Sequence, residues 1–127
     1  RTATVVADST VTALWLSTQS MQQIMQDSPE LSASLWKTAG MRFAENILGA
    51  KRPYNSWNQM QFRRWLNDGE VISPADGEKV NLYGKIAVLI NGQCTTPSSQ
   101  EVISAPSQLD VAEASFQGNA KVFIRQA

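Results

Sequence analysis

Apolar and polar residues alternate with a period of two at both ends of the chain and with a helical period in the middle. Residues 2–7 and 11–16 combine this alternation with β-branched side chains, which predicts two adjacent strands joined by a turn. From about residue 17 the apolar spacing changes to i, i+3, i+4, so helices are expected before residue 69. Short β-prone runs return beyond residue 80, which predicts a small antiparallel β module.

The first two predicted helices have clear start and stop signals. Hydroxyl residues at 17–20 can cap a short helix, and Ser28 followed by Pro29 begins a second one, because serine caps and proline suits the first helical position. Gly49 ends the second helix, and Gly40 within it is expected to mark close packing against another backbone. The apolar row of this helix is predicted at every fourth position, namely Leu31, Leu35, Ala39, Phe43 and Ile47, with Trp36 and Leu48 flanking it.

A third helix is predicted from a capping box. Ser56 and Gln59 have the spacing at which each side chain satisfies a free backbone amide of the first turn. The apolar side of this helix is expected to consist of Met60, Trp65 and Leu66. The tryptophans of the chain could line an aromatic binding site, but helical positions of three favour packing in the core; they are Trp15, Trp36, Trp57 and Trp65.

Turn signals divide the region beyond residue 80 into several strands. The run "KIAVLI" predicts a strand that ends at Asn91-Gly92, a dipeptide that favours a type I′ hairpin turn. Gly118-Asn119 predicts another turn between the last two β-prone runs. Residues 95–100, "TTPSSQ", are small and polar, so a mobile loop is expected there.

Composition excludes several classes of function. Eleven Lys and Arg balance eleven Asp and Glu, so the net charge is zero and the general attraction to a nucleic acid backbone is missing. The chain has no histidine and one cysteine, Cys94, which excludes Ser-His-Asp catalysis, an internal disulfide and a cysteine-based zinc site. The carboxylates Asp8, Asp27, Glu30 and Glu45 are scattered, so we expect a solvated surface, no enzyme activity and no metal or cofactor.

Arg1 and Thr2 are the candidate binding residues, because a guanidinium beside a hydroxyl can hold an anion. The run "RTATVVADSTVTALWLSTQSMQQIM" resembles the end of the phosphate-binding cassette of a cyclic nucleotide-binding domain, with its following strand and helix. The resemblance rests on Arg1, Ala3, Thr4, Val5, Ala7, Asp8, Leu14, Leu16, Met21, Ile24 and Met25. It implies that Arg1 holds the cyclic phosphate of cAMP or cGMP and that Thr2 contacts phosphate or purine. The Gly-Glu part of the cassette is missing, so this chain alone is not expected to form a competent pocket.

The next segment narrows the resemblance. "SPELSASLWKTAGMRFAENIL", with Leu35 to Thr38 as its most distinctive element, is similar to Na+/H+ exchangers of the plant salt-overly-sensitive type and the sperm type. This implies a cytosolic regulatory fragment of an antiporter, on the cytoplasmic side of the plasma membrane, with the transmembrane part of the transporter as partner and a homodimer as assembly.

The expected fold is α+β: the C-terminal part of a cyclic nucleotide-binding-like β-roll with following helices in residues 1–68, then the small antiparallel β module in 69–127. The expected mechanism is conformational. A ligand, or an internal contact replacing it, repositions the helix of residues 31–48 and shifts the transporter between inhibited and active states. Two alternatives remain open: a nucleotide-responsive domain of a channel or other regulator, and a structural dimerisation or autoinhibitory domain with a vestigial pocket.

Overall fold

The computed structural model describes residues 4–127, which belong to two compact units. The first ends at Ser32 and contains α1 (Thr18–Asp27). Ser17 caps α1 by accepting a hydrogen bond from the backbone amide of Ser20, which confirms the predicted hydroxyl cap. Residues 4–17 form no helix or strand, so the two strands predicted at 2–7 and 11–16 are wrong wherever the structure describes them.

The second unit comprises Ala33–Ala127 and contains the sheet with the helices that pack on it. Helix α2 (Pro29–Leu48) begins where Ser28 accepts a hydrogen bond from the amide of Leu31, as predicted. Its buried residues are Gly40, Ala44 and the predicted flanking residue Leu48, while Phe43 and Ile47 of the predicted row are partly buried against the same core. Gly40 marks close packing, but against side chains of the sheet and not against another backbone as predicted: a Cβ at Gly40 would lie 2.7 Å from Cγ2 of Val71 and 3.3 Å from Cβ of Phe123.

A short 3-10 helix, η1 (Tyr54–Ser56), precedes α3 (Gln59–Asn67). The predicted capping box is wrong: Asn58 caps α3 by accepting from the amide of Met60, while the hydroxyl of Ser56 donates to the carbonyl of Pro53. Met60 is 69% exposed, and the buried side of α3 consists of Phe62 and Leu66. The cap therefore lies two residues beyond the predicted Ser56, whose hydroxyl is already hydrogen-bonded to Pro53.

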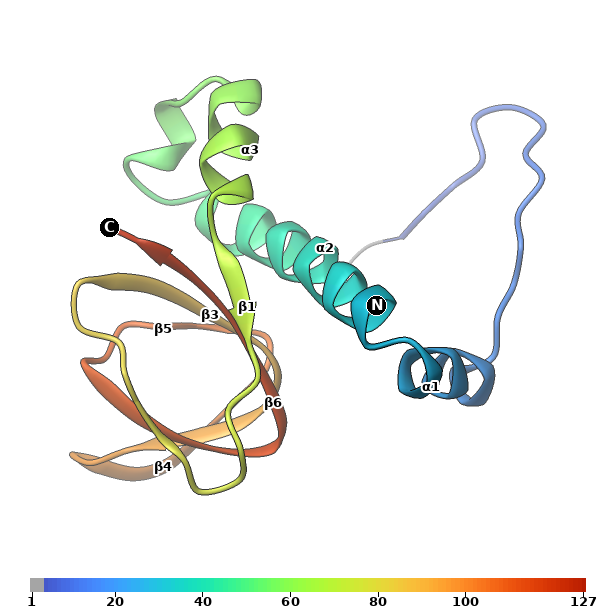
Figure 1. Ribbon diagram of the computed structural model, residues 1–127. Coiled ribbons are helices and arrows are strands. Elements are labelled where there is room, and N and C mark those ends of the chain that lie inside the picture. The colour runs from blue at the N-terminus through green and yellow to red at the C-terminus, as the bar shows by residue number, and fades with distance from the viewer. Residues whose placement is uncertain (1–3) are drawn as a thin grey trace. The chain divides into compact units, whose positions relative to one another are not determined.

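The sheet is antiparallel and is built around two long strands, β3 (Lys85–Thr96) and β6 (Glu113–Gln126), which pair along most of their length. Four shorter strands extend this pair. On the β6 side lie β1 (Glu70–Ile72) and β2 (Lys79–Asn81), and on the β3 side lie β4 (Ser99–Ser104) and β5 (Ser107–Leu109). Figure 1 shows that the strands curl into a roll, with α2 and α3 beside one end of β1.

Alternate side chains of the long strands serve two different cores. Ala87 and Leu89 join Val122 in a cluster inside the roll, whereas Val88 and Ile90 join Phe123 in a cluster against α2 and α3. Burial on both faces explains why the run "KIAVLI" is continuously apolar instead of alternating. The helices and the sheet therefore share one of the two cores. The division into domains at 1–68 and 69–127 stays a prediction.

Two expected turns are bends inside the long strands. Asn91-Gly92 lies within β3 and Gly118-Asn119 within β6, and the pairing register shifts between Leu89 and Gln93. Gly92 has a φ of 88°, and a Cβ there would lie 2.7 Å from the carbonyl oxygen of Gln117. The same left-handed backbone that suits a hairpin turn here produces a β-bulge, so the hairpin predictions are wrong.

The predicted loop at residues 95–100 is also shorter than expected. Thr96 ends β3 and Ser99 begins β4, so only Pro97 and Ser98 connect the two strands. Among the described residues, no helix is long and apolar enough to cross a membrane.

Candidate functional site

The predicted ligand residues Arg1 and Thr2 lie outside the described residues, so their role stays a prediction. Within the run that carried the resemblance, the segment from Thr4 to Leu16 is exposed and irregular, whereas the segment from Thr18 to Met25 lies in α1. The candidate site within the second unit must therefore be built from other residues.

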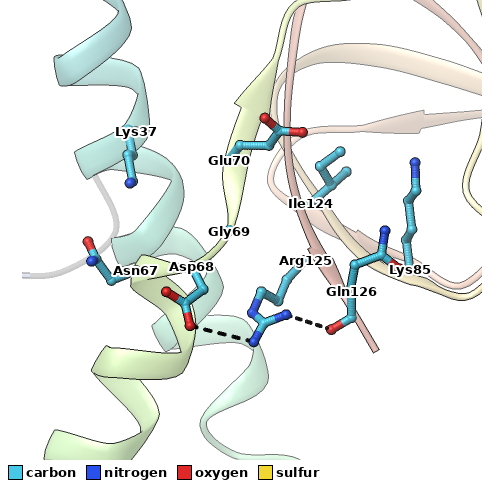
Figure 2. Close-up of a pocket in the computed structure, with 9 residues that line it drawn as sticks. All are labelled: Lys37, Asn67, Asp68, Gly69, Glu70, Lys85, Ile124, Arg125 and Gln126. Atoms are coloured by element: carbon cyan, nitrogen blue, oxygen red, sulfur yellow. Dashed lines mark hydrogen bonds and ion pairs between the residues drawn. The ribbon is translucent and has the colours of Figure 1, made fainter.

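A polar pocket of about 280 Å³ lies where the end of α3 meets β1 and the last residues of β6. Figure 2 shows its lining: Lys37, Asn67, Asp68, Gly69, Glu70, Lys85, Ile124, Arg125 and Gln126. Three cations and two carboxylates are among these residues. The three cationic residues are half-buried, whereas both carboxylate residues are exposed, and the lining carries one more positive than negative charge.

Arg125 is the most constrained charged side chain of this pocket. Its Nε donates a hydrogen bond of 3.0 Å to the carbonyl of Trp65 in the last turn of α3, and its guanidinium carbon lies 5.0 Å from the centre of the Trp65 ring. Nη1 donates to the carbonyl of Gln126, and Nη2 lies 3.8 Å from Oδ2 of Asp68 (Figure 2). We call this set of contacts the Arg125 clasp, because it fastens the end of β6 to the end of α3.

The backbone at the base of the pocket is tightly packed. Gly69 joins α3 to β1, and a Cβ at this position would lie 2.4 Å from Cζ of Phe123 and 2.9 Å from the carbonyl oxygen of Ile124. No larger residue fits there without displacing β6. The glycine thus lets the chain pass directly over β6, which brings Asp68 and Arg125 to the same wall.

An aromatic cluster lies beside the clasp, in η1 and α3. Tyr54 packs against Trp57, Phe62 and Trp65 with ring centres 5.1 to 5.4 Å apart. Burial raises the pKa of the Tyr54 hydroxyl, because the phenolate would lose solvation. These rings fill the core between helices and sheet, which confirms packing for Trp57 and Trp65.

The other two tryptophans differ from each other. Trp36 packs against the same core and lies 5.6 Å from Nζ of Lys121, whereas Trp15 is 82% exposed. No set of tryptophans forms an open aromatic cage among residues 4–127. Packing, not ligand stacking, therefore explains three of the four.

Cys94 lies inside the roll instead of beside a turn. Its side chain is fully buried, and burial raises the pKa of the thiol because the thiolate is poorly solvated there. The scattered carboxylates stay apart: Glu45 forms an ion pair with Arg63 at 3.0 Å, and no cluster of potential metal ligands occurs among the described residues.

Comparison with known proteins found similarity of structure only. No protein-family model matches the chain, and no curated protein matches it either. The regulatory domain of Toxoplasma gondii PKA, solved with cAMP, superposes with a TM-score of 0.52 at 11% identity and covers 85% of this chain. This chain covers 47% of that protein's chain.

Two further solved structures are less similar. The sensor domain of the transcriptional regulator DNR from Pseudomonas aeruginosa has a TM-score of 0.48 at 16% identity, covering 68% of this chain and 73% of its own. The C-linker/CNBHD of zELK channels has a TM-score of 0.41 at 11% identity, and the match covers 81% of this chain and 61% of the zELK chain. None of the three is a Na+/H+ exchanger, so that assignment stays a prediction. The chain has an α+β cyclic nucleotide-binding-like fold, in which an antiparallel roll packs against a few helices.

Proposed function

We propose that this chain is a non-enzymatic regulatory segment that acts through its cyclic nucleotide-binding-like fold. Two observations support the proposal: the fold itself, and the way in which the sheet is fastened to the helices. The Arg125 clasp joins β6 to α3, and the hydrophobic cluster around Phe123 joins β6 to α2 and α3. A conformational change in the roll would therefore be transmitted to the helices through these contacts. A ligand shifts such a two-state system only by its differential affinity for the two states.

The finer proposal follows the sequence resemblance to Na+/H+ exchangers. In this proposal the segment lies on the cytoplasmic side of the plasma membrane, forms a homodimer and controls the transmembrane part of an antiporter. Cyclic nucleotide, bound through Arg1 and Thr2, or an internal contact in its place, changes the position of α2. The resemblance of the segment from Leu35 to Thr38 supports this proposal.

A calorimetric titration of cAMP and of cGMP tests the proposal. It is made with this chain and, where the natural polypeptide extends beyond it, with the longer polypeptide, each beside an Arg1→Ala variant. Loss of a charge-assisted phosphate contact weakens binding by about 1.5 to 3 kcal/mol. The exposed Arg52 provides the matched control, since Arg52→Ala removes equal charge without touching the predicted ligand residues.

Two outcomes would contradict the nucleotide role. Saturable binding that Arg1→Ala leaves unchanged would remove Arg1 from the site, and absence of heat with folded protein would indicate a vestigial pocket. In the second case, a molecular mass that increases with protein concentration and does not change when cAMP or cGMP is added would favour the alternative, a structural dimerisation or autoinhibitory domain.

The proposed context is tested separately from the ligand. Binding of this chain to the membrane part of an exchanger, or a transport rate that changes when the chain is deleted, would support the antiporter context. A parent polypeptide with a channel or a DNA-binding segment would instead support the alternative of a nucleotide-responsive domain of another regulator.

A further inference from the structure

The pocket beside the Arg125 clasp, which is lined by residues of the second unit, has the features of an anion-binding site. The guanidinium of Arg125 has five N–H donors. Hydrogen bonds within the described residues use the single donor on Nε and one of the two on Nη1. The contact with Asp68 spans 3.8 Å, which is too long for a hydrogen bond. Several donors of an immobilised arginine therefore have no short-range acceptor among residues 4–127.

Arg125 is already held in one orientation. Its side chain is 21% exposed, because the Trp65 ring covers one face of the guanidinium and the Trp65 carbonyl fixes Nε. A planar guanidinium held in this way can bind carboxylate or phosphate oxygens with two parallel hydrogen bonds. Little further ordering of the arginine is needed when such a group binds, which favours binding.

The distribution of charge in the pocket favours an anion over a cation. Lys37 and Lys85 are half-buried, and neither forms an ion pair within the part of the chain that the structure describes. The opposing carboxylates, Asp68 and Glu70, are exposed, and Asp68 is 69% exposed. Solvent therefore screens the carboxylates more strongly than the cations, and a lining of three cations and two carboxylates favours an anion.

The negative end of the α3 dipole does not reverse this preference. The carbonyl of Trp65 accepts from Arg125 and from the amide of Asp68, and the carbonyl of Leu66 accepts from the amide of Gly69. Two of the last carbonyls of the helix, those of Trp65 and Leu66, thus already accept hydrogen bonds, so they oppose an anion less than free carbonyls would.

We propose that this pocket binds the oxyanion group, a carboxylate or a phosphate, of a small ligand. Arg125 is the principal contact, the half-buried lysines supply further positive charge, and Asp68 is the side chain that the ligand displaces. This site goes beyond the proposed cyclic nucleotide role, because it involves neither Arg1 nor Thr2. Since Arg125 also fastens β6 to α3, occupation of the pocket acts on the joint between sheet and helices.

The test is a titration of the full chain followed by amide chemical shifts in two-dimensional NMR spectra. Inorganic phosphate and acetate are added separately, and sodium chloride at equal ionic strength is the reference. The expected result is a saturable change at the amides of residues 68–70 and 125–126 with at least one of the two oxyanions. The oxyanion that saturates the shift change at the lower concentration shows whether the pocket prefers a phosphate or a carboxylate group.

Three variants make the assignment specific. Arg125→Gln should weaken binding at least tenfold. Asp68→Asn should tighten it about two- to fivefold, because it removes the competing carboxylate. Arg63→Gln is the matched control, since Arg63 is also on α3 but pairs with Glu45, and it should leave the dissociation constant unchanged. Arg1→Ala should also leave it unchanged, which separates this site from the proposed nucleotide site.

Several results would overturn the proposal. These are shift changes that stay linear and equal those with chloride, phosphate or acetate binding that Arg125→Gln does not weaken, and weaker binding in Asp68→Asn. If Arg125→Gln fails to fold, the Asp68→Asn titration still decides, because Asp68 is largely exposed and its amide variant keeps the shape of the side chain.

Discussion

Residues 11–16, "VTALWL", and residues 85–90, "KIAVLI", are runs of equal length and similar composition, but only the second forms a strand. Leu14 and Trp15 are 89% and 82% exposed, whereas Val88 and Leu89 are fully buried. The difference lies in what surrounds each run. β3 has β6 on one side and β4 and β5 on the other, so its backbone groups find partners, and both of its faces meet a core.

This contrast shows that β-propensity describes how well a side chain fits a sheet that already exists. Branched and aromatic residues favour extended backbone, but a strand also needs hydrogen-bonding neighbours. Residues 4–16 have the alternating pattern, but the described part of the first unit contains no strand with which they could pair. The free energy of unfolding should therefore depend strongly on one run and hardly at all on the other.

The most direct test replaces one large side chain in each region. Phe123→Ala should lower the free energy of unfolding by about 3 to 5 kcal/mol, because it opens a cavity between the sheet and both helices. Trp15→Ala should change it by less than about 0.5 kcal/mol, since the ring is exposed. Denaturant titrations measure both values, and a large loss in Trp15→Ala would show that the first unit has a core contact after all.

A second comparison uses two glycines with the same backbone conformation. Gly92 and Gly77 have φ values of 88° and 83°, but a Cβ at Gly92 would meet backbone atoms of β6 while a Cβ at Gly77 would meet nothing within 4 Å. Both alanine variants carry the left-handed strain of about 1 to 2 kcal/mol. Gly92→Ala should cost about 1 to 3 kcal/mol more than Gly77→Ala in thermal or denaturant unfolding. Equal losses would mean that the bulge adapts to a methyl group.

The Arg125 clasp provides a smaller effect. Arg125→Gln removes a charged hydrogen bond to the end of α3 and the stacking on Trp65, and should lower the free energy of unfolding by about 1 to 2 kcal/mol. Arg63→Gln removes an exposed ion pair with Glu45 and should cost less than about 1 kcal/mol. If the two variants were equally stable, the clasp would contribute no more than an ordinary surface pair.

The smallest effect concerns alkaline pH. Burial raises the pKa of the Cys94 thiol above its ordinary value, so the folded protein holds the thiol proton more firmly than the unfolded chain. This contribution to stability is complete below the unfolded pKa and is lost as pH rises through the folded pKa. The free energy of unfolding should fall above about pH 9 in the unmodified chain and fall less in Cys94→Ala. Parallel curves would show that the thiol does not titrate differently on folding.

The sequence predicted the helices better than the strands. Caps at Ser17 and Ser28 and the end of α2 before Gly49 depend on neighbours in sequence, and the structure confirms all three. The Asn91-Gly92 and Gly118-Asn119 predictions failed because positive φ angles occur in bulges as well as in hairpin turns. Sequence pattern fixes the local backbone, whereas pairing at a distance decides between these two uses.

The candidate pocket was not predicted, because its residues are far apart in the sequence and unremarkable in their local patterns. Arg125 follows Phe123 and Ile124 in a β-prone run, and its local pattern does not distinguish it from other strand residues. A charged residue at the end of an apolar strand was the only available signal. Its meaning depends on Gly69, whose missing side chain lets the end of α3 approach β6.

The contact between Arg125 and Trp65 also gives the protein an optical property. A positive charge 5.0 Å from the centre of an indole ring exerts an electric field on it, and the emission wavelength of an indole responds to such a field. Movement of the guanidinium away from the ring would therefore change the colour of Trp65 fluorescence. In a variant with the other three tryptophans replaced by phenylalanine, the emission wavelength of Trp65 would show in real time when the contact between β6 and α3 opens, without an attached dye.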